Sequence, residues 1–270
     1  MSIISRFAPS PTGYLHLGHA YSAWLAWRRA DIFRLRLEDI DATRCRPAFY
    51  AAIEEDLRWL GIGWQGEVRV QSAHFPEYAA TLAILRERGL LYPCFCTRAD
   101  IARAITAPHG AEQIYPGTCR HLSATERAEK IAAGVPYAWR LDVKAASAQA
   151  GVPKFFEEQQ GWITAQPERL GDAVLARKDT PASYHLCVVH DDALQNITHI
   201  IRGEDLFEAT HMHVLLQSLL GLPTPIYAHH KLLTGPDGKR LAKRDRSQTL
   251  RELRAAGTTA ASILNNFEGA

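Results

Sequence analysis

The sequence has no long apolar run and no strong excess of charge of either sign. No hydrophobic stretch approaches the roughly 20 residues that cross a bilayer, which argues against a membrane-spanning helix. The first residues also lack the pattern of a signal peptide, because Arg6 and a Pro/Gly-rich stretch interrupt them at once. We therefore expect a cytoplasmic protein with no membrane partner.

The small net charge of +2 at pH 7 excludes a uniformly basic coat for nucleic acid, although it is compatible with a local basic face. Internal repeats are absent as well. The 270 residues are 47% hydrophobic and 22% charged, which is typical of an ordinary globular protein. A chain of this length can bury a large core, either as one domain with an embellishment or as two domains.

Cysteine is scarce and odd in number. Of five cysteines, three lie close together in a segment rich in glycine and proline, namely Cys94, Cys96 and Cys119. In a reducing compartment such a group favours a metal over disulfides, and thiolates this close can enclose a tetrahedral Zn²⁺. A structural zinc is favoured, because no carboxylate base accompanies the group. The alternative is three buried free cysteines. The candidates for a fourth ligand are Tyr115, His121 and, less favourably, His109.

The N-terminal segment has the order strand, loop, helix. Residues 2–5 are short and suited to a buried strand, and a Pro/Gly-rich loop follows. A helix is predicted next from apolar residues at helical spacing: Ala20, Trp24 and Trp27. Its start carries His16, Gly18 and His19, where unpaired N–H groups and a glycine without Cβ allow a phosphate to approach. The alternative is two surface histidines at a helix N-terminus.

A second strand is predicted over residues 32–39, where apolar and charged residues alternate. Two strands joined through a helix make a βαβ unit and predict a parallel sheet. Ligands of such sheets bind beyond the carboxyl ends of the strands, where Arg6, Glu38 and Asp39 fall. The alternative for these charges is a solvated salt-bridge face.

Further elements follow from apolar periodicity and from Pro and Gly at element ends. Helices are predicted from Pro47 to Gly61, from Pro76 to Gly89, over 125–133 and around Met212 to Leu219. Strands are predicted over 137–141, 183–189, 197–201 and 225–228. The strand at 197–201 is followed by Arg202, again a charge at a carboxyl end.

A Gly-Pro-Asp-Gly turn at 235–238 precedes a basic run in which five of the eight residues from Lys239 to Arg246 are cationic. Such a run is most often solvated surface. In a chain whose first helix already suggests phosphate binding, it predicts a clamp for a polyphosphate.

Five motifs taken together closely resemble class I glutamyl-tRNA synthetases. They lie, in order between residues 3 and about 256, at 6–19, 36–39, 184, 201–204 and 240–244. The resemblance implies a Rossmann-type sheet that binds ATP, with Mg²⁺ on the phosphates, through His16, Gly18, His19 and Lys243. His16, His19 and Lys243 would then be the catalytic residues.

The resemblance also implies a glutamate site, made by Arg6, Ala8, Ser10, Glu38, Tyr184 and Arg202. Chemistry agrees with this set, because Glu38 can pair with the ammonium group while Arg6 and Arg202 grip carboxylates through paired N–H donors. A nucleotidyltransferase shares the His-x-Gly-His logic but needs no such set. A non-catalytic RNA- or zinc-binding module would have no use for the Lys243 loop.

Two features resemble a shortened branch of this family. The chain stops at Ala270, where full-length members continue into an anticodon-binding region, and the set Cys94, Cys96, Tyr115 and Cys119 resembles the zinc site of the short members. Those enzymes are ligases that activate glutamate and esterify it onto the queuosine base in the anticodon loop of tRNA(Asp). The alternative is a short or truncated glutamyl-tRNA synthetase that charges tRNA(Glu). We expect a monomer.

The resulting fold prediction is α/β. A split Rossmann-type catalytic domain is expected over 1–91 and 172–235, with an inserted zinc-binding α+β acceptor subdomain over 92–171. Residues 236–270 would form the ATP-clamp loop and a short helical C-terminal extension, without an anticodon-binding domain. Three positions depart from the family pattern: Arg240, Ala242, where serine is common, and His185, where asparagine is common.

Overall fold

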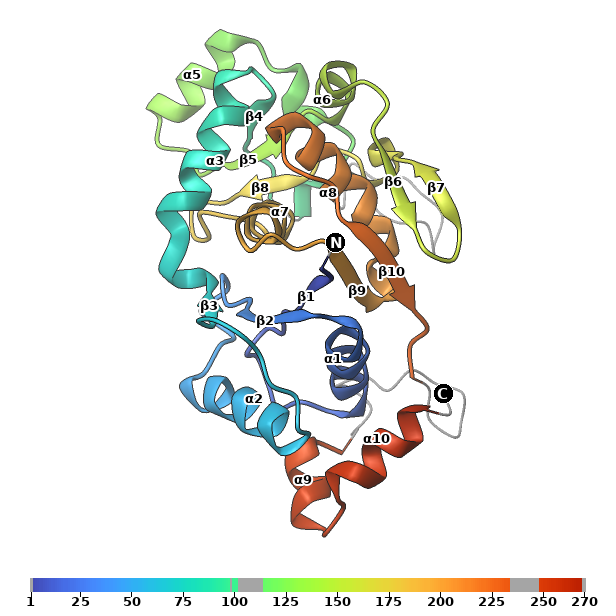
Figure 1. Ribbon diagram of the computed structural model, residues 1–270. Helices are drawn as coiled ribbons and strands as arrows, with labels where there is room; N and C mark the ends of the chain where they lie inside the picture. The colour runs from blue at the N-terminus through green and yellow to red at the C-terminus, as the bar shows by residue number, and fades with distance from the viewer. Residues whose placement is uncertain (1, 98, 102–113, 234–247, 269–270) are drawn as a thin grey trace.

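The computed structural model describes residues 2–97, 99–101, 114–233 and 248–268, and strands alternate with helices along most of it (Figure 1). Its strands are β1 (Ile4–Phe7), β2 (Ile32–Leu37), β3 (Arg69–Val70), β4 (Leu91–Cys94), β5 (Ala138–Leu141), β6 (Lys154–Glu157), β7 (Gly161–Thr164), β8 (Val174–Ala176), β9 (His199–Gly203) and β10 (Ile226–His230). Its α-helices are α1 (Leu17–Arg29), α2 (Pro47–Trp59), α3 (Phe75–Glu87), α5 (Ala124–Ala132), α6 (Val143–Ala150), α7 (Tyr184–Leu194), α8 (Phe207–Leu220), α9 (Leu250–Ala255) and α10 (Ala260–Glu268). Short 3₁₀ helices are η1 (Gln71–His74), η2 (Thr118–His121), η3 (Pro167–Leu170) and η4 (Glu204–Leu206).

The predicted parallel sheet is confirmed, in two parts. One part has the order β1-β2-β3, with all pairs parallel and Ile4 opposite Ile32. The other has the order β7-β6-β10-β9, in which β10 is parallel to both β9 and β6. Helix α1 links β1 to β2, and α8 links β9 to β10, as expected for parallel strands.

The two parts meet where β1 and β9 begin. The Thr198 N–H donates to the Ile4 carbonyl at 2.9 Å, and the Ile4 N–H donates to Thr198 Oγ1 at 2.9 Å. Within the described residues, no other backbone hydrogen bond joins β1 to β9. The strands are therefore joined at their amino ends and are not paired toward their carboxyl ends.

A third, antiparallel sheet has the order β4-β5-β8. It lies with α5 and α6 at one end of the molecule, while α9 and α10 lie at the opposite end beside α2 (Figure 1). The hairpin β6–β7 falls inside the predicted 92–171 insertion, yet it pairs with β10 rather than with this sheet. The hairpin therefore extends the parallel sheet, and the predicted domain limits stay a prediction.

One predicted strand is wrong. The strand predicted over 183–189 is instead the start of helix α7, from Tyr184 onward, although Cys187, Val188 and Val189 suggest a strand. The Ser183 hydroxyl caps this helix by accepting a hydrogen bond from the Leu186 N–H, and residues 186–189 are all buried. A helix that is apolar on most sides loses its periodic pattern, so tertiary burial overrides the local preference for a strand.

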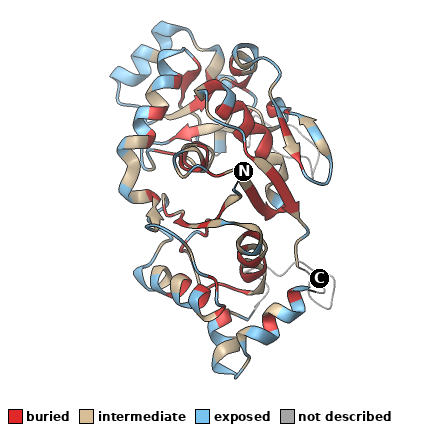
Figure 2. Cartoon of the chain, in the orientation of Figure 1, coloured by how far each residue is buried: buried red, intermediate tan, exposed pale blue. Residues whose placement is uncertain are grey.

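The buried residues, red in Figure 2, concentrate on the sheets and on helices α1, α7 and α8. One cluster packs α1 and α2 against β1 and β2, and the other packs α7 and α8 against β4 and β5. Within the described part of the chain, no helix is both long enough and apolar enough to cross a bilayer.

Candidate active site and cysteine cluster

A cavity of about 640 Å³ opens beyond the carboxyl ends of β1, β2 and β9. Every predicted glutamate-binding residue lines it: Arg6, Ala8, Ser10, Glu38, Tyr184 and Arg202. The described residues that were predicted to bind ATP line it as well: His16, Gly18 and His19. Lys243, Arg240 and Ala242 lie outside the described residues. Segments far apart in the sequence thus meet in one space.

Arg6 is held by a single acid. Its Nε donates to Asp192 Oδ1 at 3.0 Å, and both side chains are buried. No other partner of the Arg6 side chain is found among the described residues, so its two terminal nitrogens are left to the cavity that it lines. An arginine held at Nε presents these two nitrogens as a paired donor for a carboxylate.

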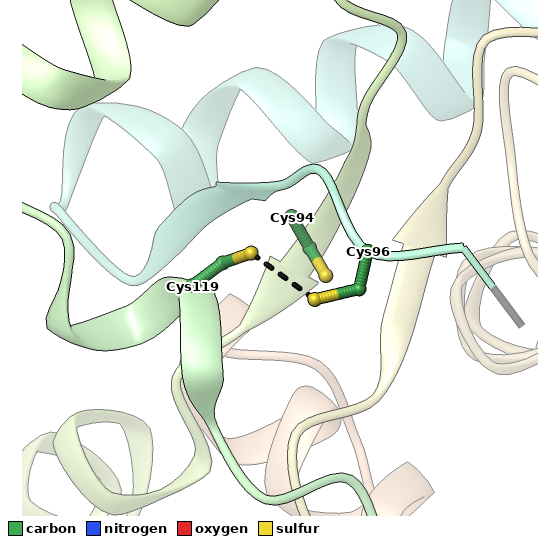
Figure 3. A group of neighbouring side chains, drawn as sticks. All are labelled: Cys94, Cys96 and Cys119. Carbon is green, nitrogen blue, oxygen red and sulfur yellow. Dashed lines mark hydrogen bonds between the residues drawn. The ribbon is translucent and has the colours of Figure 1, made fainter. Parts of the chain in front are cut away.

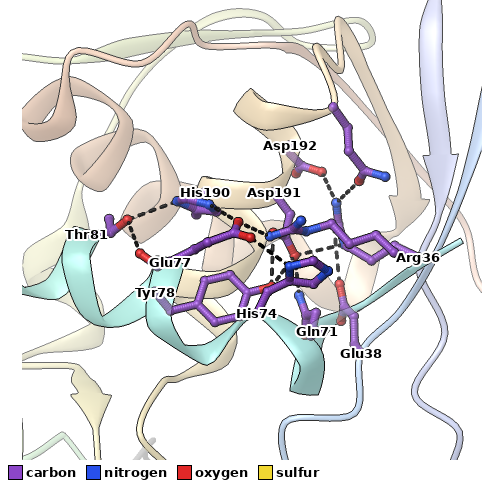
Figure 4. A network of polar contacts seen from close by, with 12 residues as sticks. Arg36, Glu38, Gln71, His74, Glu77, Tyr78, Thr81, His190, Asp191 and Asp192 are labelled. Atoms are coloured by element: carbon purple, nitrogen blue, oxygen red, sulfur yellow. Dashed lines mark hydrogen bonds and ion pairs between the residues drawn. The ribbon is translucent and has the colours of Figure 1, made fainter. Parts of the chain in front are cut away.

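Arg36 holds both Asp192 and Glu38. Its Nη1 donates to Asp192 Oδ1 at 2.8 Å and its Nη2 to Glu38 Oε1 at 3.3 Å (Figure 4). Arg36 is fully buried, and Arg6 and Asp39 are buried as well, which argues against the solvated salt-bridge face considered from the sequence. Burial alone would lower the pKa of Arg36, but the Asp192, Glu38 and Asp191 carboxylates raise it above the usual value.

The pKa values of Glu38 and Asp192 are shifted in opposite directions. Burial raises the pKa of Glu38, and the guanidinium groups of Arg36 and Arg6 offset this only in part. Burial would also raise the pKa of Asp192, but Arg6 and Arg36 hold it below the usual value. Asp192 therefore has two cationic partners. Glu38 shares Arg36 with Asp192, so its charge is only partly balanced, and it suits a cationic ligand.

Arg202 differs from Arg6, because all its partners are neutral. Its Nε donates to His229 Nε2 at 3.2 Å, and its Nη2 donates to Thr210 Oγ1 at 2.7 Å and to the Leu206 carbonyl at 3.1 Å. The contacts of Nη1 are the longest, at 3.4 Å to His213 Nδ1 and 3.5 Å to Tyr184 Oη. This cation is 5% exposed, and no carboxylate pairs with it among the described residues.

The histidines around Arg202 are kept neutral. Burial and the Arg202 charge lower the pKa of His229 to about 3 and hold that of His213 well below its usual value. Burial and Arg202 also lower the pKa of His185, which lies 3.1 Å from His213, to about 4. The environment of Arg202 therefore satisfies its hydrogen bonds without neutralising its charge.

The start of α1 is capped by its own histidines. His16 Nδ1 accepts from the Gly18 N–H at 3.1 Å, and His19 Nδ1 accepts from the His16 N–H at 3.3 Å. Because Nδ1 accepts in each ring, a neutral ring carries its proton on Nε2. The histidines thus take two of the N–H groups that the sequence left for phosphate, and Nε2 becomes the donor atom of each ring.

The residues that flank the 234–247 segment either line this cavity or pair with residues at the start of α1. Leu232 and Leu233 line it before the segment. After the segment, Thr249 forms a bridge with His16, and the Leu250 N–H donates to the Leu15 carbonyl at 2.8 Å.

Sequence reasoning missed Asp192, His213 and His229. The signal for Asp192 was the acidic pair at 191–192, which lay beyond a segment interpreted as a strand. In a helix, Asp192 lies about two turns after Tyr184, and both reach the cavity region from α7. His213 is on α8 and His229 on β10, and only the tertiary fold brings them to Arg202.

The three cysteines meet as predicted. The sulfur atoms of Cys94, Cys96 and Cys119 all lie within 4.8 Å of one another, and those of Cys96 and Cys119 are 3.4 Å apart (Figure 3). The Tyr115 hydroxyl lies 3.4 Å from the Cys94 sulfur and 3.6 Å from the Cys96 sulfur. Three thiols are usual donors of Zn²⁺, and with the phenol beside them they give the four groups that a tetrahedral site requires. His121 is not part of the group.

A second cavity, of about 580 Å³, lies between the first one and this cluster. It shares Ile40, Asp41 and Tyr184 with the first cavity, and Tyr115 lines its other side. Arg140, also in its wall, lies over the Tyr115 ring at 4.0 Å and donates to the Asp172 carbonyl at 2.6 Å. The cysteine cluster therefore supports one wall of the second cavity.

Comparisons with known proteins agree with this geometry. A family model described as tRNA synthetases class I (E and Q), catalytic domain, matches residues 2–268. The chain is 46% identical to a glutamyl-Q tRNA(Asp) synthetase of Rhodobacter capsulatus, covering 97% of this chain and 98% of that relative. It is 43% identical to a protein of the same name from Nocardia farcinica, covering 96% of this chain and 81% of the relative.

Among solved structures, the chain resembles a glutamate tRNA ligase from Elizabethkingia meningosepticum in complex with its amino acid. The TM-score is 0.73 at 28% identity. The match covers 91% of this chain and 52% of the solved chain, so this protein spans about half the length of that ligase.

Proposed function

This chain belongs to the family of class I tRNA synthetases (E and Q), and we propose that it activates L-glutamate with ATP and transfers the glutamyl group to the queuosine base of tRNA(Asp). The near-full-length matches to glutamyl-Q tRNA(Asp) synthetases support this assignment over a synthetase that charges tRNA(Glu).

The observation that carries the proposal is the unpaired buried charge of Arg202. A cation with only neutral partners is stabilised by an anion that enters the cavity, and its longest contacts, at Nη1, are the easiest to exchange. An amide in place of the carboxylate would leave this charge uncompensated. The site therefore selects glutamate over glutamine by the cost of a buried unpaired cation.

Glu38 and Arg6 complete the amino-acid site. Glu38 pairs with the ammonium group of the substrate, since among the described residues its carboxylate has one contact, at 3.3 Å, with Arg36. The free terminal nitrogens of Arg6 offer a paired donor to a carboxylate, and Tyr184 adds a neutral hydroxyl beside Arg202. Ala8 and Ser10 line the same space on the loop after β1.

Activation requires alignment and charge stabilisation more than acid–base chemistry. An oxygen of the glutamate α-carboxylate attacks the α-phosphorus of ATP, the bond to the bridging oxygen breaks, and pyrophosphate leaves with glutamyl-adenylate as the product. His16 and His19 donate from Nε2 to phosphate oxygens at the start of α1, Gly18 admits them, and Lys243 balances the charge of the leaving pyrophosphate. Mg²⁺ would neutralise part of the triphosphate charge.

For the transfer step, we place the acceptor nucleoside in the second cavity. It adjoins the glutamate site at Tyr184 and Asp41, so a hydroxyl group could reach the activated carbonyl from that side. The hydroxyl oxygen attacks the carbonyl carbon and the ester bond forms. The bond from that carbon to the phosphate oxygen breaks, AMP leaves, and the hydroxyl proton is released to water.

The inserted segment would be held by Zn²⁺ on Cys94, Cys96, Cys119 and Tyr115. A bound zinc would supply a structural cross-link between β4 and η2, which carry or adjoin the cysteines. We keep the acceptor subdomain at 92–171 as part of the proposal, with the β6–β7 hairpin paired to the catalytic sheet.

Two assays test the assignment. Glutamate-dependent exchange of pyrophosphate into ATP is expected, and glutamine should not replace glutamate. Labelled glutamate is then offered with queuosine-containing tRNA(Asp), queuosine-free tRNA(Asp) and tRNA(Glu). Label on the first RNA alone supports the proposal, whereas label on tRNA(Glu) alone overturns it in favour of a short glutamyl-tRNA synthetase.

Replacing Lys243 tests the ATP clamp. Lys243→Ala should reduce adenylate formation by at least about 100-fold, because one charge on the developing pyrophosphate is lost. Glutamate affinity should change little. Lys239→Ala, in the same basic run, is the matched control and should reduce exchange much less. Unchanged pyrophosphate exchange in Lys243→Ala would remove the clamp role.

A further inference from the structure

Arg6 and Glu38 face the same cavity with opposite charges and yet do not pair. Their charges are close enough for Arg6 to lower the pKa of Glu38. Each is instead held by another group: Arg6 by Asp192 at 3.0 Å and Glu38 by Arg36 at 3.3 Å. If they paired, the ammonium partner and the carboxylate clamp of the substrate would neutralise each other.

Asp192 stands between these two pairs. Its Oδ1 accepts from both Arg6 and Arg36, so one oxygen ties β1 and β2 to helix α7. Asp192 is 3% exposed and does not line the cavity, so it does not touch a ligand there. Its action on the substrate must pass through Arg6.

We propose that Asp192 is a positioning residue that keeps the guanidinium of Arg6 away from Glu38, so that the empty site stays open for both ends of a bound amino acid. This inference rests on the proposed function and concerns the same site. Fixing Arg6 at Nε costs nothing at the moment of binding, because the paired terminal nitrogens already face the cavity.

Helix α7 makes the arrangement rigid. The helix is buried along residues 186–189 and is capped by Ser183, and its neighbouring acid Asp191 is tied to Arg69, Gln71 and Tyr78 (Figure 4). Asp192 therefore cannot follow Arg6 if that side chain moves. Asp191 serves as an internal control, since it is equally buried and, among the described residues, has no contact with Arg6. Of its three hydrogen-bond donors, only Gln71 lines the cavity.

The test is a double-mutant cycle between Asp192→Asn and Glu38→Gln. Its readout is the dissociation constant of glutarate, measured by calorimetry on the full chain. Glutarate has both carboxylates of glutamate and no ammonium group, so it reports on the arginines whether or not Glu38 is present. Asp192→Asn should weaken glutarate binding about tenfold when Glu38 is present, because Glu38 then captures Arg6.

In the Glu38→Gln background the same substitution should weaken glutarate binding less than about twofold, because no acid remains to capture Arg6. Equal losses in the two backgrounds would overturn the proposal, since a purely structural role does not depend on Glu38. The control Asp191→Asn should lower the melting temperature and leave the glutarate affinity within about twofold. An Asp191→Asn loss as large as that of Asp192→Asn would also overturn it.

A pyrophosphate-exchange assay separates this inference from the proposed function. Asp192→Asn should raise KM for glutamate about tenfold and leave KM for ATP unchanged. Absence of glutamate-dependent exchange in the unmodified protein would defeat the function and leave the glutarate cycle valid. Should Asp192→Asn not fold, Asp192→Glu replaces it in the cycle, since the added methylene displaces the carboxylate from its present contact with Arg6 Nε. Equal losses in both backgrounds again overturn the proposal.

Discussion

Arg6 and Arg202, the two arginines predicted to bind glutamate, offer different interactions to a substrate. Arg6 has its charge balanced by Asp192 and keeps its terminal donors, whereas Arg202 has its donors satisfied and keeps its charge. A substrate carboxylate gains directional hydrogen bonds from the first and electrostatic attraction from the second. Neither residue alone offers both.

Replacing Arg202 should therefore damage glutamate binding selectively. Arg202→Ala should raise KM for glutamate by about 100-fold, which corresponds to roughly 3 kcal/mol for a charged interaction lost in a buried site. KM for ATP should stay within about threefold. Arg202→Lys should recover part of the loss, because it restores the charge but not the hydrogen bonds to Thr210 and Leu206. Steady-state exchange at varied glutamate measures this, and equal effects on both KM values would contradict it.

Glutamate binding should weaken in acid. Because the pKa of Glu38 is raised above 4.5, protonation of Glu38 begins at a higher pH than for an exposed glutamate. The neutral form loses its attraction for ammonium, so KM for glutamate should rise as pH falls from 7 toward that raised pKa. Glu38→Gln should bind weakly at all these pH values and show a flatter profile. A profile of equal steepness in both proteins would show that another group titrates.

At the scale of elements, α7 connects the parts of the site. Its first residue, Tyr184, lies between the two cavities, and its last turns hold Asp191 and Asp192 beneath the catalytic sheet. The helix was also the element that the sequence assigned to the wrong class, as a strand over 183–189. The same burial that makes it a rigid support removes the alternation of polar and apolar residues by which a helix is recognised.

Secondary-structure elements with a clear local pattern were predictable from the sequence. The side chains that hold the cavity arginines in place were not. The strand at 32–37 and the helix from Pro47 follow from periodicity and from proline at the helix start. The strand predicted over 197–201 follows from its β-branched and apolar residues, and the structure places it at His199–Gly203. Cavity residues such as Arg6 and Glu38 follow from strand ends and from a family resemblance. The contacts of Arg202 with His213 and His229 join three separate elements, and no local pattern encodes such a meeting.

Removal of the metal should destabilise mainly β4 and η2. Elemental analysis of freshly purified protein should give one zinc per chain, and a chelator should raise amide exchange in β4 and η2 more than in β1 or β9, because the thiolates join these segments. Tyr115→Phe should reduce zinc retention more than His121→Ala, since only Tyr115 reaches the sulfurs. No zinc in the fresh protein, or the reverse order of the two variants, would contradict the site.

At the scale of the whole molecule, the buried histidines link folding to pH. His185, with a pKa of about 4, stays neutral in the folded protein and takes up a proton below about 6.5 when unfolded. The unfolded state then binds more protons, so stability falls as pH decreases from about 6.5 to 4, by up to about 1.4 kcal/mol per pH unit for this group. His213 and His229 act in the same direction.

Denaturant unfolding at several pH values measures this slope. His185→Gln should be less dependent on pH over that range than the unmodified protein, although it is less stable at pH 7.5. Identical slopes for the two proteins would show that other groups govern acid unfolding.

Strands β1 and β9 are joined at their amino ends, by the hydrogen bonds between Ile4 and Thr198, and separate toward their carboxyl ends. Arg6 lies on β1 and Arg202 on β9, and among the described residues no backbone hydrogen bond joins these strands at their carboxyl ends. An amino acid that contacts both arginines would bridge the two strands at that end. A shorter homologue such as aspartate is therefore expected to contact only one of the two arginines at a time.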